Sequence, residues 1–320
     1  MNTKFILFIS LVVLVFFGSV AYLSSTGGET GRLKSVAQHH ITVLLDLSDR
    51  IGSKKGGTTQ VNRDLQDIKT VVDVFKQQVK RNYYVNSRDQ LAVVVSRQKG
   101  SDPAAQSTNQ ADFTINMAAL PINGKQHKFV EALTDTLFKQ TGRLYSQVQA
   151  QEATKGFTGA DIWSFFESEL PLYLMTGKKA PQDSIIQTLV IITDGYNDFS
   201  EAVLKTRPFN GNRTSYGQVR RLAAKPEPLS TFDKGNYGMM SSQKYPDLRV
   251  VVLELSPAGN NSFHEQLIRG YWNKWFQEMG IPSEHYKLLL NNTPPSNTEN
   301  ALVEVMTAPN KQSQPLAAAK

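Results

Sequence analysis

Apolar and polar positions follow two kinds of pattern along this chain. Runs that are apolar throughout and rich in β-branched residues predict buried strands at 41–47, 90–96, 184–195 and 247–256. Shorter candidate strands lie at 112–118 and 285–290. Apolar residues that recur every three or four positions predict helices at 61–81, 128–151, 160–175 and 263–280, with a weaker helix through 301–305. Strands alternating with helices predict an α/β fold: a doubly wound, mostly parallel central sheet with helices on both faces.

The N-terminus carries a separate signal. A cationic start at Lys4, the apolar run FILFISLVVLVFF and a small-residue step ending at Ala21 are typical of an export signal. Counted through Leu23, the run is also just long enough to span a bilayer. Residues 1–23 are therefore expected to be a signal peptide or a retained membrane anchor. Either outcome places the protein body outside the cytoplasm, in the periplasm or cell envelope.

The rest of the chain divides by composition. Residues 24–39 are rich in Ser, Gly and Thr and are expected to form a tether, and 40–308 form the folded body. Within the body, residues 196–247 are rich in Gly, Asn, Pro and basic residues, which predicts a long insert with at most a short helix and few core contacts. The tail, 309–320, is polar and then Ala-rich and is expected to fray.

Composition excludes several function classes. The chain has no cysteine, so it has no disulfide, thiolate nucleophile or Cys-ligated zinc. The net charge of +7 is spread along the sequence, and the small basic cluster around Arg220 is interpreted as a solvated loop, so no nucleic-acid partner is predicted. None of the five histidines has the spacing of a helical zinc site, and no G-x-S-x-G, Walker or G-x-G-x-x-G motif occurs.

Candidate chemistry lies where the strands end. The first strand runs into Asp46, Ser48, Asp49 and Arg50, and the third long strand ends in Thr193-Asp194-Gly195. The carboxyl ends of strands in an open α/β sheet are where ligands bind. The segment TKGFTGAD, which lies between them in sequence, adds Thr158 and Asp161 before a helix. Carboxylate and hydroxyl oxygens suit a hard cation such as Mg²⁺. The predicted ligands, for Mg²⁺ or for Mn²⁺ or Ca²⁺ in its place, are Asp46, Ser48, Asp194, Thr158 and Asp161.

Three motifs carry a resemblance to a known family. D-L-S-D-R (46–50), G-A-D-I (159–162) and V-I-I-T-D-G (190–195) together resemble the von Willebrand factor A family, in element order over roughly 40–308. That family uses a metal-ion-dependent adhesion site with the pattern D-x-S-x-S, a loop Thr and a later Asp. The resemblance implies that Asp46, Ser48 and Asp194 hold a cation whose open position is completed by a carboxylate of a protein ligand. It implies adhesion-type binding and no enzymatic activity.

Two departures from the family pattern leave alternatives open. Arg50 replaces the second Ser of the motif, and the loop Thr aligns with Ala160, which leaves Thr158 or Asp161 to act. An arginine beside a cation is unfavourable unless it points away or pairs with Asp49. The chain could instead be a metal-free scaffold in which Arg50 replaces the cation, or a metal-dependent hydrolase that uses the two acids. Asp46 and Asp194 could order turns, and Asp161 could cap the following helix.

Overall fold

The computed structural model describes residues 37–52, 57–96, 113–122, 124–155, 160–174, 185–197, 219–257 and 262–309. All of them belong to one compact unit, Ala37–Pro181 with Ile185–Lys320. The predicted signal or anchor, nearly all of the tether and tail, and the candidate ligand Thr158 lie outside the described residues. None of the helices in the ranges given above combines the length and the apolar character of a membrane-spanning segment.

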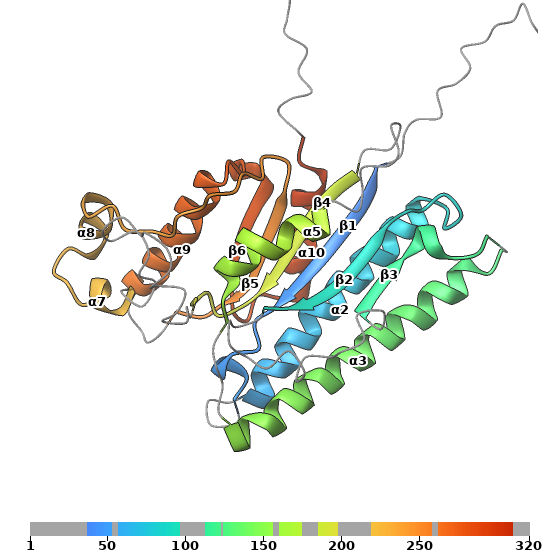
Figure 1. Cartoon of the computed structure of the whole chain (residues 1–320), viewed down its shortest axis with the longest axis horizontal. Helices are drawn as coiled ribbons and strands as arrows, with labels where there is room; N and C mark the ends of the chain where they lie inside the picture. The colour runs from blue at the N-terminus through green and yellow to red at the C-terminus, as the bar shows by residue number, and fades with distance from the viewer. Residues whose placement is uncertain are drawn as a thin grey trace, which may run out of the picture. The chain divides into compact units, whose positions relative to one another are not determined.

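The described residues form a six-stranded sheet in the order β3-β2-β1-β4-β5-β6 (Figure 1). The strands are β1 (Gln38–Leu45), β2 (Gln90–Val95), β3 (Thr114–Asn116), β4 (Ile185–Ile192), β5 (Arg249–Leu255) and β6 (Tyr286–Leu290). Neighbouring strands are parallel except for β2 and β3, which pair antiparallel. The predicted α/β fold with a mostly parallel sheet is therefore confirmed.

Both faces of the sheet are buried, which explains why its strands are apolar at successive positions. On one face Val43, Val190 and Val251 share a core with α2 (Gly57–Arg81), α3 (Gln126–Lys155) and α10 (Pro295–Thr307). On the other face Leu44, Ile191 and Val252 share a core with α4 (Ile162–Ser164), the π-helical turn η6 (Phe165–Glu169), α5 (Leu170–Leu174) and α9 (Ser262–Glu278). Figure 1 shows α2 and α3 together on one side of the sheet.

The described part of the long insert differs from the prediction. Residues 219–247 contain two short helices, α7 (Val219–Ala223) and α8 (Pro228–Lys234), and contribute buried side chains to the core beside α9. The Phe232 ring lies 4.9 Å from the Tyr271 ring, centroid to centroid, and the Trp163 indole donates to the Met240 carbonyl. The expectation of few core contacts is wrong here, because isolated aromatic residues pack without any periodic pattern. Residues 198–218 lie outside the description.

Candidate functional site

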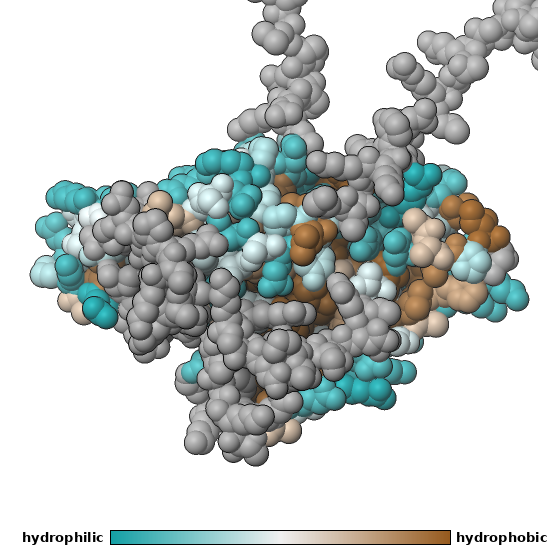
Figure 2. Space-filling model, viewed as in Figure 1, coloured by the Kyte–Doolittle hydropathy of each residue, from teal (hydrophilic) through white to brown (hydrophobic). Residues whose placement is uncertain are grey.

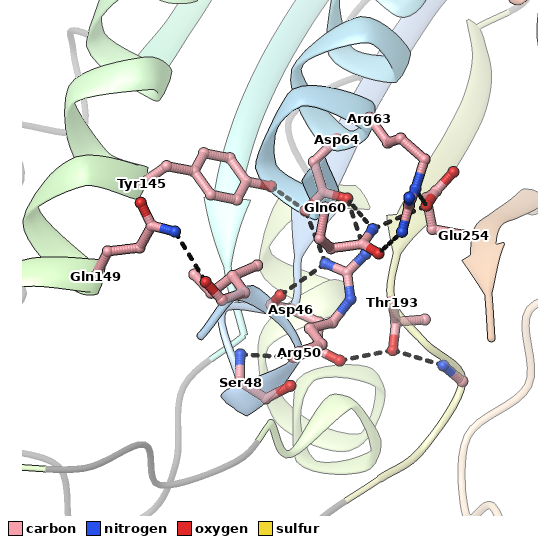
Figure 3. A network of polar contacts seen from close by, with 12 residues as sticks. Asp46, Ser48, Arg50, Gln60, Arg63, Asp64, Tyr145, Gln149, Thr193 and Glu254 are labelled. Carbon is pink, nitrogen blue, oxygen red and sulfur yellow. Dashed lines mark hydrogen bonds and ion pairs between the residues drawn. The ribbon is translucent and has the colours of Figure 1, made fainter. Parts of the chain in front are cut away.

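The two central strands bring the first two candidate acids together. β1 and β4 pair in register up to Leu45 and Ile192, so both strands end at the same level of the sheet. The amide of Asp46 still donates to the Ile192 carbonyl, at 3.0 Å, and the Thr193 hydroxyl donates to Asp46 Oδ2 at 2.7 Å. The strand ends are thus joined by a side-chain hydrogen bond as well as by the sheet (Figure 3).

Asp46 is fixed and fully buried. Its Oδ1 accepts a hydrogen bond from the Ser48 amide at 2.9 Å, which orders the turn before the 3₁₀ helix η1 (Asp49–Ile51). Burial raises the pKa of Asp46 above its usual range, against the lowering effect of the Arg50 charge and of hydrogen bonds from Ser48 and Thr193. The alternative that Asp46 orders a turn is confirmed, and its role as a cation ligand stays a prediction; the turn leaves its carboxylate held in one geometry.

Asp194 is held beside it by a tight turn. Its Oδ1 accepts from the Tyr196 amide at 3.0 Å, and the Thr193 hydroxyl accepts from the Gly195 amide. Gly195 has a φ of +93°, and a Cβ there would lie 2.5 Å from Leu255 Cδ2, so the turn requires glycine. Burial and the charge of Asp46 raise the pKa of Asp194 to about 7. Two acids in mutual repulsion therefore occupy this edge of the sheet.

The two carboxylates at this edge could supply only part of the oxygen ligands that a hard cation needs. Asp46, Asp194 and the buried Ser48 supply oxygen atoms, the ligand type that Mg²⁺ prefers. Within the described ranges, no group of three or more His, Asp or Glu side chains is placed to hold a metal. A cation here would therefore rely on hydroxyl and water oxygens in addition to the two acids, as Mg²⁺ usually does.

Asp161 caps a helix, which confirms the alternative weighed for it. Its two carboxylate oxygens accept from the Ser164 amide at 2.8 Å and the Ser164 hydroxyl at 2.6 Å. Its role as a cation ligand stays a prediction, as does that of Thr158. The same helix start is tied to the Asp194 loop, because Asn197 Oδ1 accepts from the Ile162 amide at 3.2 Å. The sequence reasoning missed Asn197, whose only signal is its position three residues after Asp194.

Arg50 has a partner that the sequence did not indicate. Its guanidinium forms two hydrogen bonds with the carboxylate of Asp64, at 2.7 and 2.8 Å, and also donates to the Asp46 carbonyl (Figure 3). Both side chains are buried. Of the two possibilities, that Arg50 points away from the candidate ligands or pairs with Asp49, the contacts direct its side chain to Asp64 on α2, a buried bidentate acceptor, and Asp49 itself is exposed. Arg50 is thus held by α2.

A polar network continues from Asp64 toward β5. Asp64 also accepts from the Tyr145 hydroxyl and from Gln60, both at 2.8 Å. Gln60 donates in turn to Glu254, which also accepts from Arg63 at 2.9 Å. Glu254 has a φ of +67°, at the point where the β5–β6 pairing shifts register. The network therefore fixes the start of α2 against the ends of β1 and β5.

Asp67, one helical turn beyond Asp64, is buried beside this network. Burial, Glu254 and Asp64 together raise the pKa of Asp67 to about 7. The folded state therefore holds a proton that the unfolded chain, with an Asp pKa of about 3.9, releases at lower pH. Stability is lost as the pH rises between these two values, because the unfolded state binds fewer protons there.

Asp67→Asn is expected to reduce the loss of unfolding free energy between about pH 4 and pH 7, because asparagine has no proton to release. Urea unfolding of both proteins across this window measures the difference. Asp73→Asn, an exposed change on the same helix, is the control and should leave the pH dependence unchanged. Equal pH dependence in the wild type and Asp67→Asn would contradict the prediction.

Comparisons with known proteins establish no family for the chain. No protein-family model and no curated protein matches the sequence. One similar solved structure is proximal thread matrix protein 1 from the mussel byssus, with 11% identity, a TM-score of 0.34, and 85% of this chain and 48% of that chain covered. Another is the pilus adhesin SpaC from Lactobacillus rhamnosus GG, with 10% identity and a TM-score of 0.32; the match covers 85% of this chain and 30% of that chain. The chain spans less than half of either, and similarity at this level supports no argument.

Proposed function

We propose that this chain is an exported, non-enzymatic binding module that holds a divalent cation at the carboxyl edge of its sheet. Asp46, Ser48 and Asp194 are the proposed ligands, with Thr158 and Asp161 as further candidates, and Mg²⁺, Mn²⁺ or Ca²⁺ is the ion. The carrying observation is that Asp46 and Asp194 lie together where β1 and β4 end, and both have a raised pKa. A cation relieves such repulsion between acids.

The strand order supports this placement. From β1 the chain continues outward through β2 and β3, and from β4 it continues the opposite way through β5 and β6. In doubly wound sheets, ligands bind at the carboxyl ends of strands where the order reverses. Here the reversal lies between β1 and β4, whose ends carry Asp46 and Asp194. A doubly wound fold similar to that of the von Willebrand factor A family belongs to the proposal.

The position of Arg50 favours a cation over a metal-free scaffold. If Arg50 replaced the ion, its guanidinium would be expected on the carboxylates of Asp46 and Asp194. Its two side-chain hydrogen bonds instead go to Asp64, and its contact with Asp46 is to the backbone carbonyl. Because Asp64 takes both side-chain hydrogen bonds of Arg50, the guanidinium does not bridge the two acids at the strand ends.

The kind of partner we propose follows from the coordination of the cation. A cation bound by two acids and a hydroxyl keeps positions for exchangeable water, and one such position accepts a carboxylate from a protein ligand. The apolar N-terminal run exports the module to the periplasm or cell envelope, and holds it at the membrane if it is not cleaved. No nucleic acid is expected as a partner.

Selection of peptide ligands from a random displayed library tests this function. In the presence of Mg²⁺, the selected peptides should carry Asp or Glu at one fixed position, and their binding should be lost with chelator. Asp194→Asn should abolish binding, whereas Asp67→Asn, which also removes a raised-pKa acid, should retain it. Selected peptides that need neither the cation nor an acidic residue would contradict the proposal.

A further inference from the structure

Two loops at the opposite, amino edge of the sheet expose apolar side chains. One joins α2 to β2 and carries Tyr83, 76% exposed, and Val85, 44% exposed; the other joins β3 to α3 and carries Ile122, 78% exposed. Figure 2 shows hydrophobic residues at the right of the view, in the region where Figure 1 places these connections. Exposed apolar side chains that form one patch with a polar rim are typical of an interaction site.

The first loop is rigidly built. Tyr83 and Tyr84 have φ values of +54° and +58°, which are unfavourable for residues other than glycine. The buried carboxylate of Asp89 holds the turn: it accepts from Asn82 at 2.9 Å and from the Ser87 hydroxyl at 2.5 Å. Strained backbone of this kind persists where the surrounding structure enforces it, and it is concentrated at functional sites. The turn therefore presents Tyr83 to solvent in a fixed position.

The second loop lies against the first. The Tyr84 ring packs edge-on against His127, with centroids 6.3 Å apart, and Gln126 donates to the Pro121 carbonyl at 3.2 Å. The three exposed apolar residues thus belong to one surface. It also carries exposed basic residues on both loops and adjoining helix ends: Lys80, Arg81, Arg88, Lys125 and Lys128. Neither 80–88 nor 117–128 contains an acid. We call these eight residues the amino-edge surface.

The chain also enters the described unit at this edge. Asn82 donates to the Ala37 carbonyl at 3.4 Å, and Gln38 donates to the Asn86 carbonyl at 3.4 Å. The sequence that precedes Ala37 contains the apolar run 5–17. Aromatic and aliphatic tips surrounded by cations complement a negatively charged bilayer surface, where tyrosine is favoured at the headgroup level.

We propose that the amino-edge surface docks onto an anionic lipid bilayer. Tyr83, Val85 and Ile122 enter the headgroup region, and the five basic residues contact lipid phosphates. In this orientation the strand ends that carry Asp46 and Asp194 face away from the membrane. The docking goes beyond the proposed cation-dependent function and needs no divalent ion.

Tryptophan quenching in vesicles tests the docking with the full chain and chelator present. The native Trp163, Trp272 and Trp275 are buried, so an added tryptophan reports on its own surroundings. The Ile122→Trp variant is mixed with vesicles of phosphatidylglycerol and phosphatidylcholine whose acyl chains are brominated. The emission of the added tryptophan should shift to the blue and lose most of its intensity. Phe263→Trp, an exposed position at the start of α9 near the carboxyl edge, is the matched control and should be unaffected.

The lipid composition tests the electrostatic part. Quenching of Ile122→Trp should fall strongly in pure phosphatidylcholine, at high salt, and after Lys125→Gln with Lys128→Gln, because the anionic surface attracts these side chains. Absence of vesicle binding, or binding without quenching at position 122, would overturn the proposal. Equal quenching at positions 122 and 263, or equal quenching in neutral vesicles, would also overturn it. Because the chelator removes divalent ions, this result does not depend on whether the proposed cation site exists.

Discussion

Arg50→Met is expected to lower the free energy of unfolding by about 3–5 kcal/mol, because it leaves a buried charge without its partner. The side chains of Arg50 and Asp64 are 4% and 0% exposed. Without the guanidinium, the donors that Asp64 keeps among the described residues are the neutral groups of Gln60 and Tyr145. Urea unfolding at neutral pH measures the loss.

Two further variants separate the buried pair from a general charge effect. Lys69→Met breaks the exposed pair with Asp73 and is expected to cost about 0–1 kcal/mol. Arg50→Met combined with Asp64→Leu removes both charges and should recover much of the lost stability, because apolar replacement of a buried ion pair is often near neutral. A cost for Arg50→Met no larger than that for Lys69→Met would show that the pair does not support the loop that follows β1.

The sheet was predictable because its strands are buried on both faces. Each long strand contains an apolar run, and the runs predicted at 41–47 and 184–195 correspond to Gln38–Leu45, which begins with three polar residues, and to Ile185–Ile192. Helix ends were less predictable. α10 extends from Pro295 to Thr307, well beyond the predicted 301–305, because its first turns carry polar residues that give no apolar period. The segment predicted as one helix at 160–175 includes a π-helical turn, which the apolar pattern did not indicate.

The site was predictable where it depends on strand ends and unpredictable where it depends on long-range pairing. Asp46 and Asp194 were identified because parallel strands end together at one edge. Nothing local indicates that Arg50 pairs with Asp64, fourteen positions later in sequence, because that pairing depends on how α2 packs. Glu254 was missed for the same reason, since it lies within an apolar strand and meets Gln60 only after folding.

Binding of Mg²⁺ at the strand ends is expected to raise the free energy of unfolding by about 4.1 kcal/mol when the ion is present at a thousandfold excess over its dissociation constant. The stabilisation should grow as the pH rises through about 7, because the ion competes with the proton held by Asp194. Asp194→Asn removes one proposed ligand and one side of the repulsion with Asp46. This variant should lose the response to Mg²⁺ and be more stable than the wild type without the ion.

Unfolding midpoints measured with and without millimolar Mg²⁺ or Mn²⁺, below and above pH 7, test the proposed site most directly. Asp49→Asn is the matched control, because it removes a neighbouring but exposed acid and should keep most of the response. The cation site predicts stabilisation of the wild type and of Asp49→Asn, larger at the higher pH, and none for Asp194→Asn. A wild-type midpoint that neither ion moves above pH 7 would contradict it and leave Asp46 as a turn-ordering acid.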